Sequence, residues 1–326
     1  MTRVAAIDCG TNSIRLLIAE PGEDGALVDV AREMRIVRLG QGVDRTGRLA
    51  PEAIARAREA LVEYTELIDK LGASAIRMVA TSATRDAINR DEFTTMVRAV
   101  LGAAPEVITG AEEAALSFAG AVAGLPDAAS PVLVADIGGG STELVLGHAP
   151  ADGGLASYSM DIGCVRMTER HLRADPPSAA QFAATVADVR AAIGAAARDV
   201  PIERAATFVG VAGTVTTLAA IEQHLSRYDP ERIHRFRLTR RAVDAMTGRL
   251  LAMTVAERRE IRGLQPERAD VILAGALVLR YLLAALGCRQ ITVSEADLLW
   301  GLLLEPLPRG AGSEVTALRN HTRRRG

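Results

Sequence analysis

A six-residue pattern of aspartate, glycine and serine occurs twice in the chain. The copies are Asp8-Cys9-Gly10-Thr11-Asn12-Ser13 and Asp136-Ile137-Gly138-Gly139-Gly140-Ser141. Glycine lets a backbone approach a ligand closely, and consecutive N–H groups in a turn can surround an anion. The hydroxyl groups add neutral donors, and the aspartate carboxylate can hold a hydrated divalent cation. The pattern therefore predicts two turns with the chemistry of a phosphate and metal site.

Apolar runs on both sides of each turn predict the elements that position it. Residues 4–7 and 14–18 flank the first copy, and residues 132–135 and 143–146 flank the second. Each set predicts a strand-turn-strand hairpin. One such turn is typical of an ordinary hairpin, but two copies indicate an internal duplication. We expect two similar lobes that face each other across a cleft, with phosphate bound by their turns.

Bulk composition excludes several classes of partner. A length of 326 residues favours about two domains, and 40 acidic against 38 basic residues leave no global field that would attract nucleic acid or a membrane. No uncharged apolar run reaches the length of a membrane span, and the first strand begins within four residues of the N-terminus. Cys9, Cys164 and Cys288 are odd in number and lack metal-ligand spacing, which favours reduced thiols. These features predict a cytoplasmic protein.

Hydrophobic periodicity predicts alternating strands and helices after each hairpin. The predicted segments are a strand at 28–39, a helix at 51–71, a strand at 76–80, a helix ending at 101, a short strand at 106–108, a helix from 110, a helix at 178–197 and a strand at 206–210. The stretch Gly124–Ala128 has the composition of a connection, so we expect an N-terminal lobe at 1–124 and a C-terminal lobe at 125–326. The C-terminal helix is a candidate to complete the first lobe. The basic tail at 319–326 has no apolar face and is predicted to be disordered.

Six ordered motifs carry a resemblance to a known family. They are residues 6–13, 80–85, 110–114, 136–143, 210–214 and 271–275, which begin respectively with Ala6, Ala80, Gly110, Asp136, Gly210 and Val271. With them the chain resembles, over essentially its whole length, the exopolyphosphatase and guanosine pentaphosphate phosphatase family (Ppx/GppA). That family is a branch of the actin, Hsp70 and sugar-kinase superfamily. The chain is most similar to short, actinobacterial-type members that lack a C-terminal HD-type domain.

The resemblance implies a two-lobed α/β protein with a duplicated ribonuclease H-like domain. The activity it implies is Mg²⁺-dependent hydrolysis of the terminal phosphoanhydride of inorganic polyphosphate, by direct attack of water, with release of orthophosphate. Mn²⁺ is an alternative cation. The family's catalytic base corresponds to Glu113, the second residue of the pair Glu112-Glu113. From the residues alone, this pair is equally typical of a helix N-terminus, where the helix dipole favours glutamate.

The same resemblance assigns ligand-binding roles. Asp8 and Asp136 would hold the metal ion. Thr11, Asn12 and Ser13 in the first turn, and Gly138, Gly139, Gly140, Ser141 and Thr142 in the second, would donate to phosphoryl oxygens. Gly213 and Thr214 follow a predicted strand and precede a predicted helix, where their N–H groups could add a contact. Arg15, Arg85 and Arg268 match arginines that the family uses on polyanionic substrate, and Arg15 lies in an apolar strand, where its charge needs a partner.

Three alternatives stay open at this point. The substrate could be pppGpp, which would yield ppGpp; the acceptor could be ADP, as in a phosphotransferase; or the chain could be a non-catalytic binding regulator. Retention of Glu113 with Asp8 and Asp136 argues against the regulator, because binding needs no base. Leu299 replaces an arginine of many relatives, which leaves substrate preference open, and Trp300 is expected in the core. A homodimer is compatible with these expectations.

Overall fold

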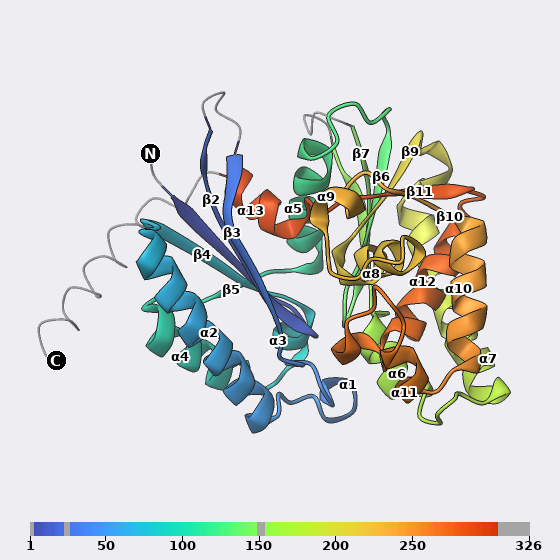
Figure 1. Cartoon of the computed structure of the whole chain (residues 1–326), viewed down its shortest axis with the longest axis horizontal. Coiled ribbons are helices and arrows are strands. Elements are labelled where there is room, and N and C mark those ends of the chain that lie inside the picture. Colours follow the sequence, from blue (N-terminus) through green and yellow to red (C-terminus); the bar gives the residue numbers. More distant parts are fainter. Residues whose placement is uncertain (1–2, 23–26, 149–153, 306–326) are drawn as a thin grey trace, which may run out of the picture. The chain divides into compact units, whose positions relative to one another are not determined.

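Two compact units make up the structure, a computed structural model that describes residues 3–22, 27–148 and 154–305 (Figure 1). The first unit is Met1–Thr109 together with the chain from Leu302 onward, and the second is Gly110–Gly301. The boundary thus lies at 109/110 instead of the predicted 124/125. The intervening helix α5 (Gly110–Ala123) belongs to the second unit because its apolar residues are buried on the second sheet. The predicted basic tail lies outside the described residues.

A five-stranded sheet of order β3-β2-β1-β4-β5 forms the first unit. The first three strands are antiparallel, and β4 and β5 run parallel to β1. The strands are β1 (Val4–Cys9), β2 (Ser13–Pro21), β3 (Leu27–Ile36), β4 (Ala75–Ala80) and β5 (Glu106–Val107). The helices are α1 (Val43–Thr46), α2 (Pro51–Leu71), α3 (Ser82–Asp86) and α4 (Arg90–Leu101).

Helix α2 shows how the sequence specifies an element locally. Pro51 occupies the first turn, where its missing N–H costs nothing, and Gly72 ends the helix in the left-handed conformation. Its buried residues recur at helical spacing and join the core of the first unit. The predicted bounds of this helix, 51–71, are confirmed.

A six-stranded sheet of order β10-β11-β9-β6-β7-β8 forms the second unit. Its strands are β6 (Val132–Ile137), β7 (Thr142–Gly147), β8 (Ala156–Met160), β9 (Thr207–Val211), β10 (Arg237–Thr239) and β11 (Gln290–Val293). Its further helices are α6 (Cys164–His171), α7 (Ala179–Asp199), α8 (Ala212–Glu222), α9 (Pro230–Ile233), α10 (Arg240–Ala252), α11 (Val255–Arg259), α12 (Ile272–Ala285) and α13 (Leu298–Leu304), of which α13 runs across the boundary into the first unit. Single 3₁₀ turns lie at Ile202–Arg204 and Pro266–Arg268.

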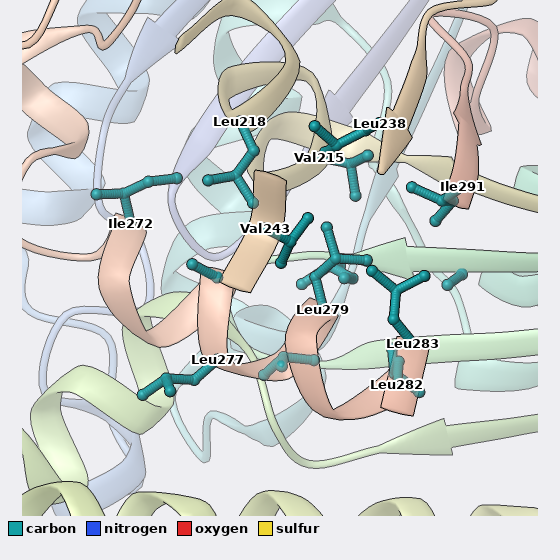
Figure 2. Packing of buried hydrophobic residues seen from close by; sticks show 14 of the residues in the cluster. Val215, Leu218, Leu238, Val243, Ile272, Leu277, Leu279, Leu282, Leu283 and Ile291 are labelled. Carbon is teal, nitrogen blue, oxygen red and sulfur yellow. The ribbon is translucent and has the colours of Figure 1, made fainter. Parts of the chain in front are cut away.

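Strand β6 is buried on both faces, and its alternation decides where Asp136 points. Leu133 and Ala135 face the large core that helices α8, α10 and α12 build, part of which Figure 2 shows. Val132 and Val134 face the opposite core, to which α5 contributes. Because side chains alternate along a strand, Asp136 lies on the α5 face.

The duplication predicted from the hairpins is confirmed by the topology. The order β8-β7-β6-β9-β11 of the second sheet repeats the order β3-β2-β1-β4-β5 of the first, with β10 added at the edge. In both sheets the three antiparallel strands are followed by parallel ones. This is the ribonuclease H-like arrangement expected for both lobes. No helix in the described segments has the length and apolar character that a membrane crossing requires.

Candidate active site

The two repeated turns have the same backbone geometry. In the first, the N–H of Gly10 donates to the carbonyl of Ser13 at 2.9 Å, and in the second the N–H of Gly138 donates to the carbonyl of Ser141 at 3.1 Å. Each turn joins two antiparallel strands whose registers match position by position. The sequence repeat is therefore a structural repeat.

In the first turn, the segment that follows β3 binds the loop carbonyls. The N–H groups of Val37 and Arg38 donate to the carbonyl of Asn12 at 3.0 and 2.8 Å, and that of Gly40 donates to the carbonyl of Thr11 at 2.9 Å. A Cβ on Gly40 would lie 2.2 Å from the Thr11 side chain, so only glycine allows this approach. The segment after β3 thus fixes the carbonyl groups of the first turn.

The start of α6 binds the carbonyl groups of the second turn. The N–H of Cys164 donates to the carbonyl of Gly138 at 3.0 Å, and the N–H groups of Val165 and Arg166 donate to that of Gly139 at 2.8 and 3.1 Å. The carbonyl of Gly140 accepts the side-chain Nε of Arg166 at 2.6 Å. All three glycine carbonyls are therefore engaged on the α6 side.

Engaged carbonyls leave the opposite edges of these peptide groups for a ligand. Within the described residues, the N–H groups of Gly139 and Gly140 donate to no acceptor. The Oγ1 of Thr11 and both amide atoms of Asn12 are buried without a hydrogen-bond partner among the described residues. Buried polar groups are normally paired, so the side-chain atoms of Thr11 and Asn12 make the first turn a candidate anion site. The undonated N–H groups of Gly139 and Gly140 make the second turn another candidate.

The two hairpins differ in the residue opposite their aspartate. Asp8 pairs in register with Arg15, whose Nη2 and Nε lie 2.6 and 3.1 Å from Asp8 Oδ2. Asp136 pairs in register with Glu143. Arg15 thus meets its charge requirement through Asp8, whereas two adjacent carboxylates, Asp136 and Glu143, share the second hairpin.

Two serines fix the carboxylates of the second hairpin. Ser117 on α5 donates to Asp136 Oδ2 at 2.6 Å, and Ser159 on β8 donates to Glu143 Oε1 at 2.7 Å. A Cβ on Gly110 would lie 2.5 Å from the Ser159 Cβ, so this glycine lets the start of α5 approach β8. Helix α5 is consequently anchored over the acidic pair at two points.

Glu113 lies on the anchored face of α5. It precedes Ser117 by four residues, and residues at this spacing lie on the same face of a helix. Its side chain is buried, at 8% relative exposure, whereas Glu112 is exposed. The structure thus brings Glu113 to the side of the helix that faces Asp136. Simple dipole pairing at a helix start would place a glutamate in solvent, as Glu112 is.

The corner between β9 and α8 holds a further part of the predicted site. Ala212 has a φ of 68°, and an added Cβ on Gly213 would lie 2.3 Å from Arg268 Nη1. The Arg268 guanidinium therefore lies directly against the first turn of α8, and its Nε donates to Gln265 at 3.0 Å. Thr214 packs against Gly275, where a Cβ would lie 2.6 Å from its hydroxyl.

Some predicted residues have clear structural partners. The Thr142 hydroxyl donates to the carbonyl of Ile162 at 2.6 Å and so supports the hairpin. Arg85 donates to the carbonyl of Ile108 at 2.8 Å, just before the chain leaves the first unit. Ser13 begins β2 beside the first turn. Leu299 is buried and Trp300 is half-buried, so the position that departs from the family pattern belongs to the packing of α13.

Sequence reasoning missed two residues of this site. Glu143 is the last residue of the motif at 136–143, but its place opposite Asp136 follows only from the strand register. A signal was available, because Asp8 to Arg15 and Asp136 to Glu143 have the same spacing. Nothing in the sequence indicates a role for Arg166, because its contact with Gly140, 26 residues away in the sequence, forms only in the folded chain.

The acidic residues fit a hydrated magnesium ion. No group of three or more His, Cys, Asp or Glu in the described segments forms a metal cage by itself. Magnesium is usually bound by one or two carboxylates together with waters and substrate phosphates, so a cage is not required. Asp136 and Glu143 form such a pair within the second unit. In the first unit, Asp8 is already held by Arg15, which donates to its Oδ2.

Comparisons with known proteins agree with this geometry. The model of the Ppx/GppA phosphatase family matches residues 17–310. The chain is 53% identical over 316 residues to exopolyphosphatase 2 of Mycobacterium tuberculosis (strain H37Rv), with 93% of this chain and 98% of that protein covered. It is 33% identical to a guanosine-5'-triphosphate,3'-diphosphate pyrophosphatase of Aeromonas salmonicida, covering 92% of this chain and 58% of that protein.

Solved structures show the same architecture. The crystal structure of an exopolyphosphatase-like protein matches with a TM-score of 0.88 at 43% identity, over 93% of this chain and 98% of the other. An exopolyphosphatase from Cytophaga hutchinsonii matches with a TM-score of 0.84 at 27% identity, over 93% and 96% of the two chains. Because the family model and a relative of 53% identity both match nearly the whole chain, the chain belongs to the Ppx/GppA phosphatase family.

Proposed function

We propose that this protein is a Mg²⁺-dependent exopolyphosphatase that removes the terminal phosphate of inorganic polyphosphate. The observation that carries the proposal is the Ser117–Asp136 hydrogen bond of 2.6 Å. It ties α5, which carries the buried Glu113 four residues before Ser117, to the strand that carries Asp136, and both elements belong to the second unit. The relatives named exopolyphosphatase support the substrate class.

Each step of the hydrolysis has a candidate residue. The N–H groups of Gly139 and Gly140 would hold the oxygens of the terminal phosphoryl group, and Arg268, whose guanidinium lies against the first turn of α8, would bind further phosphate. Glu113 would orient a water and accept its proton as the water oxygen bonds to the terminal phosphorus. The bond from that phosphorus to the bridging oxygen breaks, and the bridging oxygen stays with the shortened chain. Magnesium, when bound by Asp136 and Glu143 of the second unit, would neutralise phosphate charge.

The protein would work in the cytoplasm on a polyanion that it recognises through these local groups. The three cysteines are free thiols, as a reducing compartment favours. With a formal net charge of −2, the chain has no general attraction for a polyanion, so recognition falls to the two turns and their arginines.

Replacing the proposed base tests the mechanism. In Glu113→Gln the water keeps a hydrogen-bond partner but loses its proton acceptor, so kcat for orthophosphate release should fall at least about a hundredfold while polyphosphate still binds. Glu112→Gln, on the same turn but exposed, is the matched control and should keep activity within about twofold. Full activity of Glu113→Gln would remove Glu113 from the role of base.

The substrate is tested in the same assay. Orthophosphate release from short polyphosphate, long polyphosphate, pppGpp and ATP is compared with purified protein and Mg²⁺. We expect polyphosphate to be preferred. A higher kcat/KM for pppGpp would instead favour the activity named for the Aeromonas relative, and polyphosphate binding without any release would favour a non-catalytic regulator.

A further inference from the structure

The second turn depends on a side chain where the first turn depends on backbone. Asn12 and Gly140 occupy the same place in the two copies of the pattern. The carbonyl of Asn12 accepts two backbone N–H groups, from Val37 and Arg38. The carbonyl of Gly140 accepts the Nε of Arg166 at 2.6 Å, and no backbone donor to it is found in the described residues. In the second turn, the Arg166 side chain therefore provides the hydrogen bond that the backbone after β3 provides in the first turn.

The geometry of the peptide group connects this bond to the ligand. A trans peptide is planar, and its carbonyl points opposite to the N–H of the next residue. The bond from Arg166 to the Gly140 carbonyl therefore sets the direction of the Ser141 N–H, just as the α6 backbone sets those of Gly139 and Gly140. Three consecutive glycines restrict the backbone little, so this direction needs an outside constraint.

We propose that Arg166 is a positioning residue that aims the Ser141 N–H at the terminal phosphate. The inference rests on the proposed phosphate-binding role of the second turn. Arg166 acts through Gly140, so its effect depends on a donor at the Nε position and not on its positive charge. This property distinguishes it from an arginine that contacts phosphate directly, which needs its guanidinium.

Two substitutions separate these roles. In Arg166→Gln the amide nitrogen is attached to Cδ, as Nε is in arginine, so the donor is kept and the charge is lost. Arg166→Met has similar length but neither donor nor charge. Arg170 is the matched control, because it lies one turn further along α6 and its Nη1 donates to Asp188 on α7 at 3.3 Å. The same two substitutions at Arg170 should leave phosphate binding unchanged.

The readout is the titration of each full-length variant with inorganic phosphate, followed by the amide signals of Gly139, Gly140 and Ser141 in NMR spectra. We expect Arg166→Met to weaken binding about tenfold and to abolish the phosphate-dependent shift of the Ser141 amide, while Arg166→Gln stays within about threefold of the wild type. In steady-state assays Arg166→Met should also raise KM for polyphosphate.

Equal loss in both Arg166 variants would overturn the proposal, because charge would then be what matters, and so would unchanged binding in Arg166→Met. If Arg166→Met does not fold, Arg166→Gln decides alone: wild-type binding supports the proposal and strong loss contradicts it. The titration needs no turnover, so it separates failure of this inference from failure of the proposed hydrolysis. If phosphate moved none of the three amides in the wild type, the binding role of the turn would itself be wrong.

Discussion

Ala212 holds a backbone conformation that is unfavourable for any residue with a Cβ. Its φ of 68° lies in the left-handed region, at the point where β9 passes directly into α8. That conformation costs roughly 1–2 kcal/mol for an L-residue other than glycine. Such strain is retained where a corner has to place particular groups, here Gly213 and its neighbour Arg268.

Replacing this alanine by glycine should therefore stabilise the protein. We expect Ala212→Gly to raise the free energy of unfolding of the second unit by about 1 kcal/mol, measured by urea denaturation. Ala245→Gly, at an exposed position inside α10, is the control and should lower it by about 1 kcal/mol, because glycine disfavours a helix interior. A loss of stability in Ala212→Gly would mean that the alanine methyl group makes a contact worth more than the strain.

The sequence indicates which single residues belong to the site more often than it indicates which groups they contact. The need of Arg15 for a counter-charge followed from its apolar strand, but the counter-charge is Asp8, a residue assigned to metal. The hydroxyl of Thr142 was assigned to phosphate and binds a carbonyl of its own unit. Both partners are set by strand register and loop packing, which composition does not reveal.

At the level of elements, the two hairpins have the same backbone and different electrostatics. The first is neutralised internally by the Asp8–Arg15 ion pair, at 2.6 Å. The second sets Asp136 opposite Glu143, and both side chains are buried, Glu143 at 1% exposure. Adjacent buried carboxylates repel each other, and a divalent cation relieves that repulsion. The second hairpin is therefore the stronger candidate for the metal.

Neutralising the acidic pair should weaken magnesium binding. In Asp136→Asn and in Glu143→Gln we expect the rise in Tm caused by added Mg²⁺ to shrink and the Mg²⁺ concentration for half-maximal activity to increase about tenfold or more. Asp188→Asn removes a carboxylate on α7 that pairs with His171, so it controls for loss of charge alone. Unchanged Mg²⁺ dependence in both acidic-pair variants would place the cation elsewhere.

Helices and strands with strong hydrophobic periodicity can be predicted from the sequence, but the unit to which each of them belongs cannot. The helix at 51–71 and the end of α4 at Leu101 follow from local signals, a proline, a glycine and apolar spacing. Helix α5 was also expected, but the Gly124–Ala128 stretch suggested that it closed the first lobe. Its membership depends on which sheet buries Phe118 and its neighbours, a tertiary property that local sequence does not carry.

At the scale of the whole molecule, each unit has its own hydrophobic core and its own buried thiol. Cys9 belongs to the core of the first unit, and Cys164 packs with Val165 and Val271 in the second. Burial raises the pKa of both thiols, with the neighbouring Asp8 adding to the effect at Cys9. Cys288 is only half-buried, although burial raises its pKa as well. The chain thus contains one buried thiol in each unit, which can report on that unit, and one thiol nearer the surface.

These thiols should report the unfolding of the two units separately. Because the thiolate is the reactive form, we expect iodoacetamide at pH 8 to label Cys288 in the native protein and to leave Cys9 and Cys164 unlabelled. With increasing urea, Cys9 should become labelled first and Cys164 at a higher concentration, since the first unit has the smaller core and multidomain chains commonly unfold in more than one step. Mass spectrometry of the peptides gives the two midpoints directly. Coincident midpoints would show that the two units unfold as one cooperative structure, and labelling of Cys9 without urea would contradict its place in the core.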